Sequence, residues 1–76
     1  MNENERPTLQ DQFLSALQSR GDVVSIFLVT GIRLYGKIEA FDSFSIILCN
    51  KTSQLICKHA ISTISPTEPV HLELDD

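Results

Sequence analysis

The strongest constraint on this 76-residue chain is a succession of five short runs that are rich in apolar and β-branched residues and separated by turn residues. Such runs are typical of β-strands, and their short connections predict antiparallel pairing in one sheet. Pro66 and Pro69 follow the last run and are expected to end regular structure. We expect the strands at residues 23–30, 32–41, 44–50, 54–58 and 61–65.

The second of these runs alternates strictly in its side chains, which predicts a strand with two different faces. Gly36 interrupts the strand in its middle and predicts the sharp bend that a small barrel requires. The expected faces are Ile32, Leu34, Gly36, Ile38 and Ala40 on one side, and Arg33, Tyr35, Lys37, Glu39 and Phe41 on the other.

One helical segment precedes the strands. Apolar residues recur at helical spacing across residues 9–20, Thr8 is a good N-cap with Asp11 in the first turn, and Gly21 is a stop signal. A single short amphipathic helix is unstable alone, so its apolar stripe must lie on the sheet. The sequence therefore predicts an α+β fold that is mainly β, with the helix capping a strongly bent five-stranded sheet or small open barrel.

An open five-stranded sheet has two unpaired edges, and such edges are normally paired or covered. Pairing the fourth strand of one copy with the fifth strand of the next would use both edges. A head-to-tail contact of this kind closes into a ring when the rotation permits, so we expect a homo-oligomer.

The charge of the chain is unevenly distributed. The formal net charge is −4, yet residues 8–65 carry five basic and four acidic side chains. A weakly basic body is compatible with local RNA binding, although it lacks a large electrostatic footprint. We expect a disordered lead-in at 1–7, one domain at 8–65, and an acidic, flexible tail at 66–76 that mainly aids solubility.

Several protein classes are disfavoured by the sequence. No apolar run reaches the length of a membrane helix, and no secretory signal is visible, so reduced thiols in the cytoplasm are expected. Cys49, Cys57 and His59 do not form a recognised metal-ligand set, and both cysteines are expected to be small buried hydrophobes. No catalytic triad-like grouping or phosphate-binding glycine loop is present, so we expect no enzyme, cofactor or metal.

Four segments then carry a resemblance to a known family: LQD at 9–11, IFLVTG at 26–31, FDSF at 41–44 and KHAIST at 58–63. Together they resemble Hfq, the bacterial family of Sm-like RNA chaperones. The likeness runs from about residue 8 to residue 70, and KHAIST is its most specific part. It implies an Sm fold closed into a homohexameric ring that binds single-stranded RNA on two faces and helps small regulatory RNAs to pair with messenger RNAs in post-transcriptional regulation and stress response.

The resemblance implies that uridine-rich RNA binds at the pore on one face, called here the proximal face. Lys58 supplies charge for phosphate, while His59 and Phe44 can stack on bases. Asp42 is acidic and is expected to act in the turn rather than on phosphate. The proximal residues implied are Gln10, Phe41, Ser43, Phe44, Lys58 and His59.

The opposite, distal face is implied to bind adenine-rich RNA through the first hairpin. Phe27 stands where tyrosine is frequent and Tyr35 where glutamine is common, and the alternative for Ile32 and Leu34 is that they are core residues. The distal residues implied are Phe27, Leu28, Gly31, Ile32, Arg33, Leu34, Gln54 and Thr63.

The lateral rim departs most from the family pattern, because Gln18, Ser19 and Arg20 replace an arginine cluster. Cys57 also stands where tyrosine is usual, which predicts a looser or repacked subunit contact. We therefore expect a weak rim with poor annealing and RNA binding retained on the faces. The alternative is a specialised paralogue or protein-binding scaffold ring with little RNA activity.

Overall fold

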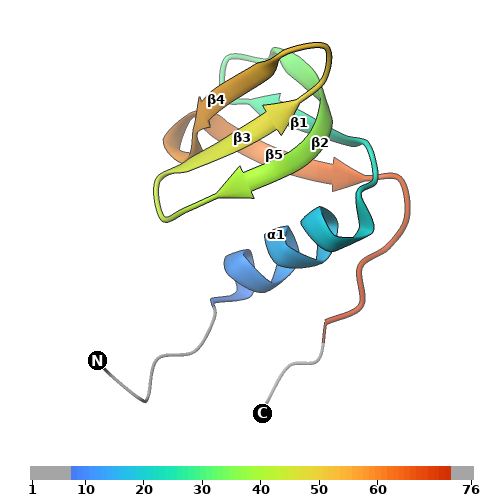
Figure 1. The fold of residues 1–76 in the computed structure, drawn as a ribbon. Helices are drawn as coiled ribbons and strands as arrows, with labels where there is room; N and C mark the ends of the chain where they lie inside the picture. The colour runs from blue at the N-terminus through green and yellow to red at the C-terminus, as the bar shows by residue number, and fades with distance from the viewer. Residues whose placement is uncertain (1–7, 73–76) are drawn as a thin grey trace.

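The computed structural model describes residues 8–72, in which one α-helix is followed by five antiparallel strands (Figure 1). The expected lead-in at 1–7 and the last four residues of the expected tail, 73–76, lie outside the described residues. The predicted fold, a helix with a bent five-stranded antiparallel sheet, is confirmed.

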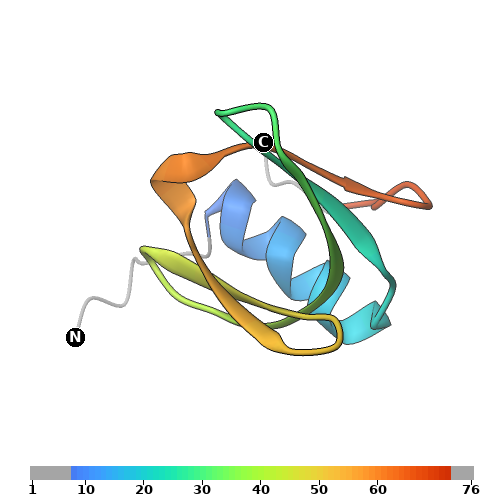
Figure 2. The same cartoon turned by 90° about the horizontal axis from the view of Figure 1, so that it is seen from above.

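Helix α1 (Leu9–Arg20) has the bounds that the sequence predicts. The hydroxyl of Thr8 accepts a 3.0 Å hydrogen bond from the backbone N–H of Asp11, which caps the first turn. Gly21 ends the helix in the left-handed region at φ 70°, and its N–H donates to the carbonyl of Leu17. The helix lies across the open end of the curved sheet, as Figure 2 shows from above.

The sheet has the order β4-β3-β2-β1-β5, and its neighbouring strands are antiparallel. A short 3₁₀ turn, η1 (Lys58–Ala60), connects the two edge strands β4 and β5. Figure 2 shows the strands curling into a nearly closed ring over the helix, so the sheet approaches a barrel. The strands are β1 (Val24–Leu28), β2 (Arg33–Phe41), β3 (Ser45–Cys49), β4 (Ser53–Cys57) and β5 (Ile61–Pro66).

Most strand bounds differ from the sequence prediction by one residue or two, and two of these differences have a clear physical cause. The first strand ends at Leu28 rather than at residue 30, because Val29 and Thr30 join Gly31 in the turn. Gly31 has a φ of 96°, which favours glycine, and its N–H donates to the carbonyl of Leu28 at 2.9 Å. Lys58 belongs to η1 instead of the fourth strand, because the chain must cross there from one sheet edge to the other.

Gly36 allows β2 and β3 to approach each other closely. A Cβ atom at this position would lie 2.7 Å from the carbonyl oxygen of Cys49 and 2.8 Å from Cγ of Leu48. The expected alternation of β2 holds as far as Ile38, where a register shift begins. Beyond that shift the expected faces are wrong, since Ala40 is exposed and Phe41 is half-buried against the core.

The core lies between α1 and the concave side of the sheet. One expectation is wrong here: Cys57 is exposed and Cys49 is only half-buried, because both lie on outward-facing positions of their strands. The buried side chains of the core are all aliphatic, which fits a small domain held together by apolar burial. They are Leu14, Leu17, Val24, Ile26, Ile38, Ile46, Leu48 and Ile56.

Candidate nucleic-acid interface

Lys58 is the centre of the proximal cluster, because it contacts α1, β2 and the β2–β3 turn. Its backbone N–H donates to the carbonyl of Phe44 at 2.8 Å, and its ammonium group donates to the side-chain oxygen of Gln10 at 2.9 Å. The same ammonium lies 5.7 Å from the centre of the Phe41 ring. The fold therefore brings together Gln10, Phe41, Phe44 and Lys58, four of the six predicted proximal residues.

Asp42 holds the turn that presents Phe44. One carboxylate oxygen accepts backbone hydrogen bonds from Phe44 and Ser45, each at 2.8 Å. These two bonds lower the pKa of Asp42, and the charge of Lys58 lowers it further. The Phe44 side chain is 71% exposed, so it is not packed in the core and is free to stack on a flat ligand.

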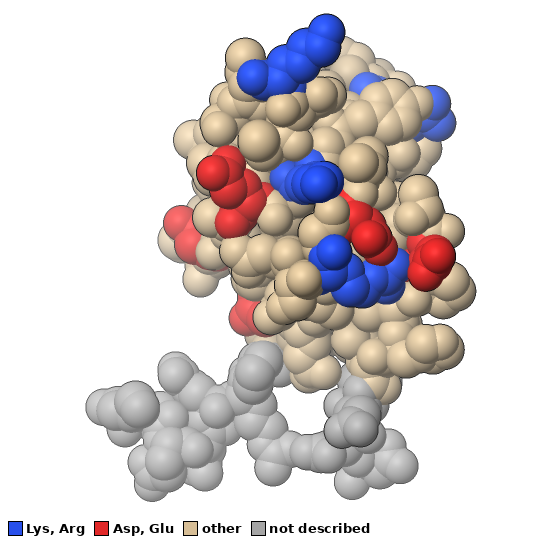
Figure 3. All heavy atoms as spheres, turned by 45° about the vertical axis from the view of Figure 1, so that its right-hand side comes forward, with Lys and Arg blue, Asp and Glu red and all other residues tan. Residues whose placement is uncertain are grey.

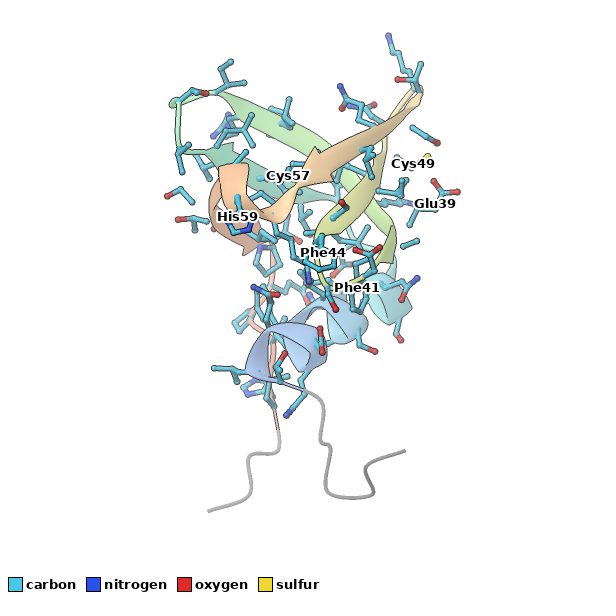
Figure 4. All side chains as sticks on the ribbon, turned by 90° about the vertical axis from the view of Figure 1, so that its left-hand side faces the viewer. Glu39, Phe41, Phe44, Cys49, Cys57 and His59 are labelled. Carbon is cyan, nitrogen blue, oxygen red and sulfur yellow. The ribbon has the colours of Figure 1, made fainter. Side chains whose placement is uncertain are left out.

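The remaining proximal residues, Ser43 and His59, are both exposed. Figure 4 shows the labelled Phe41 and Phe44 side chains at the β2–β3 turn and His59 beyond the end of β4. An open pocket borders this region between α1 and β5, and Gln10, Phe13, Lys58 and Ile61 contribute to its lining. Within residues 8–72 no hydrogen bond or ring contact fixes the His59 imidazole, which leaves it available to a ligand.

The distal residues form a row across three strands. Phe27 in β1 pairs with Arg33 in β2 on one side and with Thr63 in β5 on the other. The guanidinium carbon of Arg33 lies 5.6 Å from the centre of the Phe27 ring and 4.5 Å from that of Tyr35. Stacked rings and a guanidinium on one face can contact both bases and phosphates.

The other predicted distal residues have different surroundings. Gly31 and Ile32 are exposed in the β1–β2 turn, with Ile32 at 56%, so Ile32 is not a core residue. Leu28 and Leu34 are half-buried and pack against the core beneath the face. Gln54 lies on β4, whereas Phe27 lies on β1. Strands β3 and β2 lie between these two strands in the sheet, so Gln54 and Phe27 are not on neighbouring strands of one chain.

The rim side chains mainly hold the domain together. Gln18 donates to the backbone carbonyl of Glu39 at 2.7 Å, which ties α1 to β2. Arg20 bonds the Asp22 carboxylate at 2.6 and 2.9 Å, and also donates to the carbonyls of Glu68 and Pro69. Ser19 is exposed, and it is the only one of the three predicted rim residues without such a contact in the described part of the chain.

The Arg20 contacts hold the first part of the expected tail against the domain. The segment after β5 runs beside α1 in Figure 1, and Val70 packs against the core. Packing therefore continues past residue 66, where the sequence analysis placed the start of the tail. The rim cation is occupied by this segment and by Asp22 rather than pointing freely to solvent.

Two further observations concern other kinds of site. The helix of residues 9–20 is too short to cross a membrane, and no other α-helix occurs between residues 8 and 72. In that same range no three side chains of His, Cys, Asp or Glu lie close enough together to hold a metal ion.

The contact of Tyr35 with Arg33 was missed by the sequence analysis, although their spacing of two residues in an alternating strand is a signal for it.

Comparison with known proteins agrees with this arrangement of helix and strands. A crystal structure described as the pleiotropic translational regulator Hfq at 1.55 Å superposes with a TM-score of 0.74 and 32% sequence identity. The match covers 76% of this chain and 98% of that one. The sequence model of the Hfq protein family matches residues 9–71. The chain therefore belongs to the Hfq family of Sm-like RNA-binding chaperones.

Proposed function

We propose that this chain is an RNA chaperone that forms a homohexameric ring in the cytoplasm and binds unpaired U-rich and A-rich RNA on its two faces. By holding two strands at once, such a ring promotes the pairing of small regulatory RNAs with messenger RNAs. The observation that carries the proposal is the proximal cluster, where the 71% exposed Phe44 ring is held by the same turn that bonds Lys58. Single-stranded RNA is commonly bound by an aromatic face together with a nearby positive charge.

The distal row supports a second, separate binding face. Phe27 and Arg33 lie on the β1–β2 hairpin, whereas Phe44 and Lys58 lie at the β2–β3 turn and η1. The two sets therefore belong to different turns of the sheet. Binding of one RNA at each set is compatible with this separation.

The edge strands support the ring. β4 and β5 are the two ends of the strand order, and Leu55 on β4 is 71% exposed. Pairing β4 of one copy with β5 of the next would cover this apolar side chain and satisfy both edges. The same pairing would also place β4 of one copy, which carries Gln54, next to β5 of its neighbour, which carries Thr63. Within one chain these two strands lie at opposite ends of the strand order.

The rim supports weak annealing. Arg20 is the only cation among the three rim residues, and it is bonded to Asp22 and to the backbone of the segment after β5. A guanidinium held in this way adds little to phosphate binding at the rim. We therefore propose that RNA is held mainly on the faces.

The alternative function is a protein-binding scaffold ring with little RNA activity. The occupied Arg20 and the formal net charge of −4 favour it. The exposed Phe44 ring and the Lys58 ammonium group near the Phe41 ring oppose it, because they match RNA better than a generic protein surface. RNA binding decides between the two.

The test is fluorescence anisotropy with oligouridylate and oligoadenylate across a salt series. Lys58→Ala is expected to weaken oligouridylate binding about tenfold or more and to leave oligoadenylate binding unchanged. The matched control is Lys51→Ala, which removes an exposed cation from the β3–β4 turn. Equal losses for both RNAs would contradict the two faces, and no binding of either RNA would favour the scaffold.

A further inference from the structure

Strands β4 and β5 diverge from one corner of the molecule, as Figure 2 shows. This corner is η1, because β4 ends at Cys57 and β5 begins at Ile61. With η1 at the pore of the proposed ring, β4 runs towards the pore and β5 runs away from it. The β4 strand of one copy is then antiparallel to the β5 strand of its neighbour, and the outer ends of the two strands, Ser53 and Pro66, lie together.

The segments beyond these outer ends carry opposite charges. Lys51 lies in the β3–β4 turn, two residues before Ser53, and Glu68 lies two residues after Pro66. Positions displaced equally and in opposite directions from a pair stay opposite each other in an antiparallel arrangement. Both side chains are exposed, so Lys51 of one copy is placed to meet Glu68 of the next.

Both charges are held on a fixed backbone and have no ionic partner in their own chain. The Asn50 amide donates to the carbonyl of Tyr35 at 3.0 Å, which ties the β3–β4 turn to β2. The guanidinium group of Arg20 donates to the backbone carbonyl of Glu68 at 3.3 Å and leaves its carboxylate unpaired. Within residues 8–72 neither the Lys51 ammonium group nor the Glu68 carboxylate forms an ion pair.

One chain alone does not bring these charges together. Strands β4 and β5 lie at opposite ends of the strand order. Figure 3 shows basic but no acidic side chains on the upper part of the displayed face, whereas the acidic side chains lie below it, nearer α1. The unpaired lysine and the unpaired glutamate therefore need a second copy of the chain to neutralise each other.

We infer that Lys51 of each copy forms an ion pair with Glu68 of the next copy, and that this contact selects how the sheet edges join; the inference rests on the proposed ring. Backbone pairing alone specifies the register of an edge only weakly. An exposed ion pair adds little stability by itself, but like charges placed opposite each other are unfavourable. Charge complementarity repeated at every boundary of the ring therefore favours one register and one head-to-tail partner.

Charge reversal tests this contact. Lys51→Glu places two carboxylates opposite each other, and Glu68→Lys places two ammonium groups opposite each other. Each variant should raise the protomer concentration at which half of the ring dissociates about fivefold or more at low salt. The double variant, which carries both substitutions, restores opposite charges and should return this concentration to the native value. Size-exclusion chromatography with light scattering across a dilution series measures it.

Mixing the two single variants gives a second, independent measurement. In an alternating ring of Lys51→Glu and Glu68→Lys chains, every boundary again carries opposite charges. An equimolar mixture should therefore assemble at a concentration at which each variant alone dissociates. High salt should reduce all of these differences, because it screens exposed charges.

The matched control is Lys37→Glu, which reverses an exposed cation on β2, away from both sheet edges, and should dissociate like the native chain. Single reversals that assemble like the native chain would contradict the ion pair, as would a double variant or a mixture no better than the single variants. In these cases the ring itself still stands. A native chain that remains single at every concentration would remove the ring and this inference together.

Discussion

The side-chain oxygen of Gln10 accepts a 2.9 Å hydrogen bond from the ammonium group of Lys58, which joins the first turn of α1 to the turn after β4. A long flexible lysine side chain is thereby held in one place beside the Phe41 ring. Ordering the cation before RNA arrives reduces the entropy lost on binding.

Replacing Gln10 should therefore weaken RNA binding on the proximal face. We expect Gln10→Ala to lower oligouridylate affinity about two- to tenfold, because the lysine loses its anchor and RNA loses a polar contact. Oligoadenylate affinity should not change. Anisotropy with both oligonucleotides measures this.

The matched control is Gln18→Ala on the same helix, which removes the bond to the Glu39 carbonyl at the opposite end. It should leave affinity for oligouridylate unchanged. A similar loss in both variants would mean that the effect comes from the helix as a whole rather than from the Gln10–Lys58 contact.

Arg20 should matter for stability and little for RNA. Arg20→Ala removes the bonds to Asp22, Glu68 and Pro69. Because these groups are only partly buried, we expect a loss of about 1 kcal/mol in the free energy of unfolding. Urea denaturation at a fixed protomer concentration measures it, since assembly makes stability depend on concentration.

Lys37→Ala, at an exposed strand position, is the control for removing a cation and should leave the urea midpoint unchanged. The opposite result for Arg20→Ala, an unchanged urea midpoint with a large loss of RNA affinity, would show that the guanidinium binds RNA phosphate. It would then be a true rim residue.

The sequence predicts local elements well where local chemistry decides them. Thr8 and Gly21 mark both ends of α1, and the runs of β-branched residues locate the five strands. Prediction from the sequence fails where the curvature of the whole sheet sets the local conformation. The register shift after Ile38 turns Phe41 to the core, and the crossing from β4 to β5 takes Lys58 out of the strand.

Site prediction has a similar limit. The family motifs locate Gln10, Phe44 and Lys58 in the sequence, yet the hydrogen bonds that join them span distant positions. Arg20 donates hydrogen bonds to the carbonyls of Glu68 and Pro69, which follow it by 48 and 49 positions in the sequence. No local sequence pattern indicates these contacts. Such contacts depend on tertiary packing rather than on spacing.

Asp42 predicts a dependence of stability on acid. Its pKa is lowered in the fold from the ordinary value of 3.8, first by the hydrogen bonds from Phe44 and Ser45. The stabilisation is therefore present above pH 3.8 and is lost as the pH falls below that value through the folded-state pKa. We expect the urea midpoint of the native chain to fall in this acidic range.

Asp42→Asn keeps an oxygen that can accept the bonds from Phe44 and Ser45 but does not titrate. Its midpoint should fall less steeply than that of the native chain between neutral and acidic pH. Parallel curves for the two proteins would show that Asp42 does not contribute to the acid response.

The account depends most on the pairing of β4 and β5 between copies, and the native mass of the purified protein tests this directly. We expect one closed species of six 8.5 kDa chains at micromolar concentration and at further dilution. A single 8.5 kDa chain under the same conditions would contradict the ring, because the two sheet edges and Leu55 would then remain uncovered.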